Sequence, residues 1–356
     1  MALGQKSSRG PLTDLRRVSA RLNELAEEYG LRVDPKAVVW QLAVGEGQRV
    51  EILKALYRDD SLLVLDEPTA VLTPKEVDDL FVVLRRLAAE PRPPRSAAGE
   101  AAMVVKGLVV PGDRGDVAVR GVDLEVRAGE IVGIAGVSGN GQRELAEAIA
   151  GLRRPSAGSI SVGGSELVTG HPAEARAAGL SYVPEGRMRD GVVPEFAVEE
   201  NLLLTESDTS AYSRFGFLRR GVIRQHCTEV VSGFTVRTPG LDTPVRNLSG
   251  GNIQKLIMAR ELSGEPKVLL VAQPTRGIDV GASQYIHLRL RAQREAGTAV
   301  LIISEDLDEV MSVSDRVVVM YEGRIAGSAD PSASTREAIG LLMAGVSGGG
   351  DGDERP

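Results

Sequence analysis

The sequence is poor in aromatic residues, in cysteine and in long apolar runs. Aromatic residues make up 3% of the 356 residues, so a hydrophobic core must be built from aliphatic side chains. The single cysteine, Cys227, excludes an internal disulfide, and no group of Cys and His has the spacing of a metal site. The chain has no apolar segment of about 18 residues and no apolar stretch after Met1, so we expect neither a membrane-spanning helix nor a secretory signal. These absences predict an intracellular protein that is still able to dock on a membrane protein.

The chain has no excess of positive charge, whereas glycine is abundant. The formal net charge of -7 argues against a protein that binds nucleic acid through bulk charge. The 41 glycines lack the three-residue period of collagen and therefore indicate glycine-dependent loops. At about 150 residues per domain, the length predicts roughly two domains.

The first part of the chain contains a short apolar run that ends in two acids. Apolar residues spaced by three and four predict an amphipathic helix over 12–29, and residues 75–89 are again helical. Residues 61–65 are typical of a buried parallel strand, and Asp66 and Glu67 follow it directly. In α/β sheets, ligands bind at this end of the strands.

The pattern becomes denser after a proline-rich linker at 91–100. Short apolar runs alternate with helical segments, which predicts an α/β layered domain over 101–346. The polar residues 347–356 predict a disordered tail. The predicted strands cover residues 103–109, 117–126, 130–135, 180–183, 267–271, 299–303 and 316–320, and a helix begins at about 141.

An internal repeat links the two parts of the chain. Residues 42–69 align without a gap on residues 248–275. Both segments contain a glycine turn, a Gln followed by a basic residue, a helix, an apolar strand and a Pro-Thr pair. So many features in one register indicate that the same module occurs twice.

The repeat carries a resemblance to a known family. The sequence LSGGNIQK from Leu248 to Lys255 resembles the signature of ABC-type ATPases, and Asp66 and Glu67 after a strand resemble their Walker B element. The chain is similar to ATP-binding subunits of bacterial ABC importers of the simple-sugar or nucleoside type, in which two ATPase halves are fused. This resemblance implies an α/β P-loop NTPase fold. Residues 101–346 would form an ABC-type nucleotide-binding domain with a helical subdomain, preceded by a partial first copy over 1–90.

A glycine-rich loop after the strand at 130–135 opens a helix, which is the context of a phosphate loop. Glycines let backbone N–H groups turn inward, and a helix N-terminus attracts phosphate. Gln142 and Arg143 replace the Lys and the Mg²⁺-binding Ser or Thr expected after Gly141, so we expect nucleotide binding to be weakened rather than abolished. The alternative is a turn without a ligand. The predicted nucleotide-binding residues here are Gly136, Ser138, Gly139, Asn140, Gly141, Gln142 and Arg143.

The second half lacks the acids of an active ATPase. Ala272 and Gln273 stand at its Walker B positions, and Glu305 stands where an active member has His. Gln cannot accept a proton from an attacking water, and loss of a general base costs about 10²- to 10⁴-fold in rate. We therefore expect no ATP hydrolysis at this site.

The resemblance implies composite sites between halves, arranged head to tail. Ser249, Gly250 and Gly251 of the second signature would contact nucleotide held by the first half, opposite Glu67. We predict Glu67 as the catalytic residue and Asp66 as the metal ligand, with ATP and Mg²⁺ as cofactors; the alternative is a solvated strand end. No Gly-x-x-x-x-Gly-Lys precedes residue 42, so we expect an N-terminally truncated form of a longer subunit.

Glu185, in the turn at 183–191, has two open interpretations. It either couples the nucleotide site to the permease, as its position in the family implies, or belongs to an ordinary exposed turn.

The resemblance implies an ATP-binding subunit for uptake of a simple sugar or nucleoside. Its partners would be transmembrane permease subunits and, indirectly, an extracytoplasmic solute-binding protein, with no nucleic acid and with a dimer possible. Its location would be cytoplasmic, peripheral on the inner face of the plasma membrane. The alternative is a non-catalytic nucleotide-binding or regulatory module, or a defective truncated gene product; whether the chain hydrolyses ATP stays open. An ABC protein acting on ribosomes or DNA is disfavoured, because the chain has no basic arm between the halves and no net positive charge.

Overall fold

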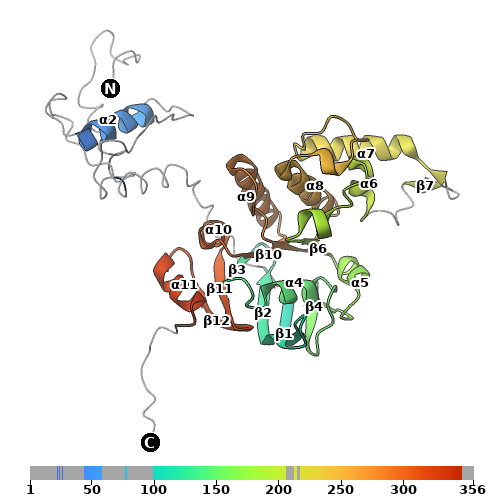
Figure 1. Cartoon of the computed structure of the whole chain (residues 1–356), viewed down its shortest axis with the longest axis horizontal. Helices are drawn as coiled ribbons and strands as arrows, with labels where there is room; N and C mark the ends of the chain where they lie inside the picture. Colours follow the sequence, from blue (N-terminus) through green and yellow to red (C-terminus); the bar gives the residue numbers. More distant parts are fainter. Residues whose placement is uncertain are drawn as a thin grey trace, which may run out of the picture. The chain divides into compact units, whose positions relative to one another are not determined.

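The computed structural model describes residues 44–57, 99–205, 212–214 and 217–346, together with the isolated positions 22, 24, 26 and 77 (Figure 1). The chain divides into two compact units, Met1–Arg92 and Pro93–Pro356. The predicted strand at 61–65, with Asp66 and Glu67, lies outside the described residues. The same holds for the tail and, apart from a few single positions, for the linker and for the helices predicted at 12–29 and 75–89.

The first unit contains one continuous described helix, α2 (Val44–Tyr57). Ile52 and Leu53 are each 1% exposed, so this helix buries an apolar side. In the second unit, helix α8 (Gly250–Leu262) begins at Gly250, the residue that the repeat aligns with Val44. The two copies of the repeated module therefore form helices over equivalent residues, 44–56 and 250–262.

A mostly parallel sheet forms the centre of the second unit. Its strands are β3 (Ile131–Ala135), β6 (Leu180–Val183), β9 (Val268–Ala272), β10 (Ala299–Ser304), β11 (Arg316–Tyr321) and β12 (Arg324–Ala329). Their order is β12-β11-β3-β10-β9-β6, and only β12 runs antiparallel to its neighbour. Every residue of β3, β9 and β10 is buried, as expected of apolar strands covered on both faces. The predicted strands in this region are confirmed.

A second sheet is antiparallel and contains β1 (Ala101–Pro111), β2 (Val117–Arg127), β4 (Ala157–Val162) and β5 (Ser165–Glu166). Its order is β2-β1-β4-β5, which confirms the strands predicted at 103–109 and 117–126. A small hairpin joins β7 (Ser213–Arg214) to β8 (Phe217–Leu218). The hydrophobic core has two main parts: Val132 and Ile134 of β3 pack into one with β1 and β2, whereas Ile131 packs into the other.

Helices cover the sheets and form a separate group beside β6. The remaining described α-helices are α4 (Gln142–Ile149), α5 (Pro172–Ala177), α6 (Val198–Leu203), α7 (Arg220–Gly233), α9 (Val280–Glu295), α10 (Leu307–Val313) and α11 (Arg336–Met343), and two short helices of other types are η2 (Arg187–Gly191) and η3 (Val245–Asn247). Figure 1 shows α6, α7 and α8 gathered together, and α8 contacts both of the other two and β6. This group corresponds to the helical subdomain that the resemblance implies. Among the described residues, no helix combines the length and apolar character needed to cross a bilayer.

Candidate nucleotide site

The loop between β3 and α4 has the backbone geometry of a phosphate loop. Gly139 and Gly141 have φ angles of 86° and 93°, in the left-handed region that favours glycine. A Cβ atom at Gly141 would also overlap the carbonyl oxygen of Ala118 on β2. Glycine is therefore required at 141 for both the turn and the close approach of two backbone segments.

The first turn of α4 presents unpaired backbone donors. Leu145 is the first residue whose N–H bonds back to the loop, donating to Gly141 at 2.9 Å. The N–H groups of Gln142, Arg143 and Glu144 have no acceptor among the described residues. Such N–H groups at a helix N-terminus, together with the helix dipole, bind anions. The loop therefore fits a phosphate group.

Two amide side chains hold this loop in shape. Gln142, which stands where the family has Lys, is 8% exposed, and its Nε2 donates to the carbonyl of Val137 at 3.1 Å. Asn140 Nδ2 donates to the same carbonyl at 3.1 Å, and Asn140 Oδ1 accepts from the N–H of Glu322 at 2.7 Å. Both side chains therefore stabilise the loop, and Gln142 has no charge to offer a phosphate.

Arg143 belongs to an ion-pair network at the start of α4. Its Nε lies 2.8 Å from Glu147, and its Nη1 lies 3.5 Å from Asp113. Arg153 bridges the same two acids, at 2.7 Å from Glu147 and 2.6 Å from Asp113. The hydrogen bond from Arg153 lowers the pKa of Asp113, and the hydrogen bond to Glu147 raises the pKa of Arg143. Arg143 therefore remains charged, but two carboxylates already contact it.

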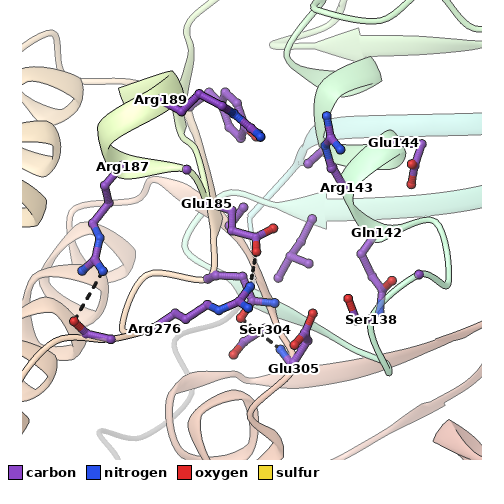
Figure 2. Close-up of a pocket in the computed structure, with 18 of the residues that line it drawn as sticks. Ser138, Gln142, Arg143, Glu144, Glu185, Arg187, Arg189, Arg276, Ser304 and Glu305 are labelled. Carbon is purple, nitrogen blue, oxygen red and sulfur yellow. Dashed lines mark hydrogen bonds and ion pairs between the residues drawn. The ribbon is translucent and has the colours of Figure 1, made fainter. Parts of the chain in front are cut away.

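An ion pair lies on the side of the site that faces the phosphate loop (Figure 2). Glu185 follows β6, Arg276 follows β9, and their side chains form a salt bridge. β6 and β9 are neighbours in the sheet, with Val183 opposite Val271, so their carboxyl ends bring the two residues together. Glu185 therefore belongs to the site rather than to an ordinary exposed turn, although its role in coupling stays a prediction.

The Walker B positions hold no acid. Ala272 ends β9, and Gln273 follows it with a φ of 50°, which is uncommon for a residue with a side chain. The N–H of Gln273 donates to the carbonyl of Ile303 at 2.8 Å, and its Oε1 accepts from the N–H of Glu305 at 3.3 Å. Gln273 is therefore held beside β10, with its side-chain oxygen already occupied.

These elements surround a pocket of about 830 Å³. Of the predicted residues, Ser138, Gly139, Gly141, Gln142 and Arg143 line it, whereas Gly136 and Asn140 do not. Gly136 has a supporting role, because a Cβ there would overlap Gln142 Nε2. The pocket is also lined by Glu144, Ala146, Tyr182, Glu185, Gly186, Arg187, Met188, Arg189, Ala272, Gln273, Arg276, Gly277, Ile303, Ser304 and Glu305.

The signature residues Ser249, Gly250 and Gly251 lie outside this pocket. Ser249 is the N-cap of α8, and its Oγ accepts from the N–H of Asn252 at 3.4 Å. Arg187 lies near these residues, because a Cβ atom at Gly250 would be 3.8 Å from Arg187 Nη1. Arg187 Nη2 donates to the carbonyl of Gly277 at 3.4 Å, and Nη1 is buried without a partner among the described residues. Burial lowers the pKa of Arg187. The signature and the phosphate loop of the second unit therefore do not meet within that unit.

The phosphate loop fits a nucleotide, but the residues around it do not fit Mg²⁺. Within the described part of the chain, no three His, Cys, Asp or Glu side chains are grouped as metal ligands. Residue 143 has no hydroxyl group, and residues 272 and 273 have no carboxylate. The predicted metal ligand Asp66 and the predicted catalytic residue Glu67 are outside the described residues.

Known proteins are similar to this chain in sequence and in fold. A family model described as "ABC transporter" matches residues 4–70 and 119–276. The chain belongs to the ABC transporter family. The nucleoside import ATP-binding protein NupA of Lactococcus lactis subsp. cremoris is 37% identical, over 96% of this chain and 79% of that protein. The glucose import ATP-binding protein TsgD13 of Haloferax volcanii is 41% identical, over 93% of this chain and 70% of that protein. These relatives confirm the resemblance to ATP-binding subunits of ABC importers.

Solved ABC transporter cassettes confirm the fold class. The ATP-binding cassette MJ1267 superimposes with a TM-score of 0.59 at 20% identity, over 70% of this chain and 100% of that chain. The dimeric post-hydrolysis state of the cassette MJ0796, bound to ADP and Pi, gives a TM-score of 0.55 at 20% identity, over 64% of this chain and 98% of that chain. At these identities the likeness concerns the fold alone.

Of the arginines that line the pocket, only Arg143 was predicted from the sequence. Arg276 lies directly after the Pro274–Thr275 pair of the repeat, and Arg187 and Arg189 lie in the turn that contains Glu185. Their positions in motifs that were already singled out were the available signal. Arg189 pairs with Asp190, the next residue in the chain. The partners of Arg276 and Arg187, Glu185 and the carbonyl of Gly277, could not be inferred from the sequence, because they lie on other segments.

Proposed function

We propose that the chain is the ATP-binding subunit of an ABC importer for a nucleoside or simple sugar. The observation that carries this proposal is a phosphate loop with free backbone donors, in a chain similar along almost its whole length to nucleoside and sugar import subunits. The chain would act at the inner face of the plasma membrane, bound to permease subunits and indirectly served by a solute-binding protein. Closure on ATP, in a dimer of ATPase halves, would drive the permease.

The two halves would contribute unequally to hydrolysis. Gln273 cannot act as a general base and Ala272 cannot organise a metal, so the second-unit pocket would bind nucleotide without hydrolysing it. Any turnover would depend on Glu67 as the residue that polarises the attacking water and on Asp66 as the Mg²⁺ ligand. Ser249, Gly250 and Gly251 would contact that nucleotide from the α8 N-terminus.

The proposal is tested by co-expressing the chain with membrane proteins encoded beside it and measuring co-purification, ATP turnover and uptake of labelled nucleoside or sugar. We expect a stable complex whose ATP turnover falls at least about 100-fold in Glu67→Gln. Glu144→Gln, which removes a carboxylate near the phosphate loop, serves as the matched comparison. Turnover that is insensitive to Glu67→Gln would show that the catalytic assignment is wrong.

A second candidate is a non-catalytic nucleotide-binding module. The contact between Gln273 and Glu305 favours it, because the side chain that replaces the base is held by a backbone donor. Saturable ATP binding with no turnover in the permease complex would select this candidate over the importer ATPase.

A further inference from the structure

The pocket of the second unit differs from an ordinary phosphate-loop site in the side chains that it offers to phosphate groups and to Mg²⁺. Such a site supplies a Lys to the phosphates and a Ser or Thr hydroxyl to Mg²⁺, with an Asp at the end of a neighbouring strand. Here these positions are Gln142, Arg143 and Ala272. None of the three side chains has a carboxylate or hydroxyl oxygen for a hard cation.

The acids near the loop do not replace these ligands. Glu147 contacts Arg143 and Arg153, and Glu185 contacts Arg276. The acids that line the pocket, Glu144, Glu185 and Glu305, come from three separate segments. Nowhere in the described ranges do they or others form a three-residue metal cluster.

The pocket does offer backbone N–H groups and guanidinium groups, both of which attract phosphate. The backbone N–H groups of residues 142–144 are unpaired among the described residues. Arg143 uses Nε and Nη1 for its acids, and Arg276 uses Nη1 for Glu185, so each guanidinium keeps N–H groups with no described partner. Figure 2 shows Arg143 beside the phosphate loop and Arg276 on the facing side, near Ser304 and Glu305. Guanidinium groups bind phosphate without a metal ion.

We infer that this pocket binds the phosphate groups of a nucleoside di- or triphosphate without Mg²⁺. Backbone donors of α4 and the guanidinium groups of Arg143 and Arg276 supply the positive charge that Mg²⁺ supplies in other phosphate-loop sites. This inference rests on the proposed function, because it names the form in which the pocket takes its nucleotide.

The test is calorimetric titration of ATP into the full chain, in excess Mg²⁺ and in EDTA. Asp66→Asn/Glu67→Gln is used as the background, so that any metal bound by that pair does not contribute. We expect dissociation constants that agree within about threefold, with EDTA the tighter condition, because free ATP is then the major species. Arg276→Gln should weaken binding about tenfold in both buffers, because it removes a charge-assisted contact. Arg154→Gln removes an exposed arginine outside the pocket and should change neither value.

A designed reversal sharpens the test. Arg143→Ser with Ala272→Asp restores a hydroxyl and a carboxylate, and we expect ATP binding to become at least about tenfold tighter in Mg²⁺ than in EDTA. If the background protein already loses about tenfold or more of its affinity in EDTA, the inference is overturned while nucleotide binding stands. Binding in neither buffer would overturn the proposed nucleotide site as well. Equal binding that is unaffected by Arg276→Gln would overturn the role of that arginine.

Discussion

The side-chain oxygen of Gln273 accepts a hydrogen bond from the backbone N–H of Glu305 at 3.3 Å. This contact joins the end of β9 to the end of β10, the two positions at which an active member of the family has its base and its switch residue. Gln273 adopts a φ of 50°, so the backbone also constrains it. The site therefore combines the wrong functional group with a fixed orientation.

Restoring the carboxylate alone should not restore hydrolysis. Gln273→Glu would place an acid beside the Glu305 N–H, but Ala272 and Arg143 would still offer no metal ligand. In the Asp66→Asn/Glu67→Gln background we expect phosphate release to stay within about twofold of the parent. Gln284→Glu, at an exposed position on α9, controls for the added charge. A rise of about tenfold or more would mean that the base alone limits this site.

The two left-handed glycines of the loop should differ in their tolerance of a methyl group. Nothing lies within 4 Å of a Cβ at Gly139, whereas a Cβ at Gly141 overlaps the Ala118 carbonyl. We expect Gly139→Ala to cost about 1–2 kcal/mol, from backbone strain alone, and Gly141→Ala to cost more and to abolish ATP binding. Urea unfolding with ATP titration measures both effects. Equal losses in the two variants would contradict the close approach of β2 to the loop.

Gln254 on α8 is a buried amide, and a buried amide without a hydrogen-bond partner lowers the free energy of unfolding. It is 1% exposed, and neither Nε2 nor Oε1 has a partner among the described residues. Replacing it with an apolar side chain of similar length, Gln254→Met, should raise the free energy of unfolding by about 1–3 kcal/mol. Gln284→Met, at an exposed position, should change it little. A destabilised Gln254→Met would show that the amide gains a partner, such as a bound water.

The network around Arg143 should make stability depend on pH in the acid range. The pKa of Asp113 lies below its usual value of 3.8, because of its hydrogen bond to Arg153. A depressed carboxyl pKa contributes stability above pH 3.8 that is lost as the pH falls through the lower, folded-state pKa. The free energy of unfolding of the native chain should therefore fall more steeply below this pH than that of Asp113→Asn. Parallel pH profiles for the two proteins would exclude the contribution of Asp113.

Much of the second unit could be predicted from short apolar runs. β3, β9 and β10 are buried along their whole length, so their sequences are almost entirely apolar, Ser304 at the end of β10 being the exception, and they stand out from the helices between them. β4 and β12 were not predicted, because they contain polar residues and are not buried along their length: β4 begins with two exposed residues, and β12 alternates between exposed and half-buried residues. The glycine loop was recognisable because the turn requires glycine at specific positions.

Pairs of side chains from distant segments could not be predicted. Glu185 and Arg276 meet because β6 and β9 are adjacent parallel strands, an order that the chain does not follow in sequence. Arg143 meets Asp113 because the turn after β1 lies beside the start of α4, whereas its pair with Glu147 is an i,i+4 contact within α4. The two contacts between distant segments depend on strand order and loop direction.

The sequence by itself determined which chemical groups the second-unit site lacks, because the functional group of each side chain follows from its identity. It showed that Gln142, Arg143, Ala272 and Gln273 offer neither a carboxylate or hydroxyl ligand for Mg²⁺ nor a general base. Only the tertiary structure decided which charges remain available to a ligand. It pairs Nη1 of Arg276 with Glu185, and it leaves the other N–H groups of that guanidinium and the first N–H groups of α4 unpaired among the described residues, because packing between distant segments determines which groups contact one another.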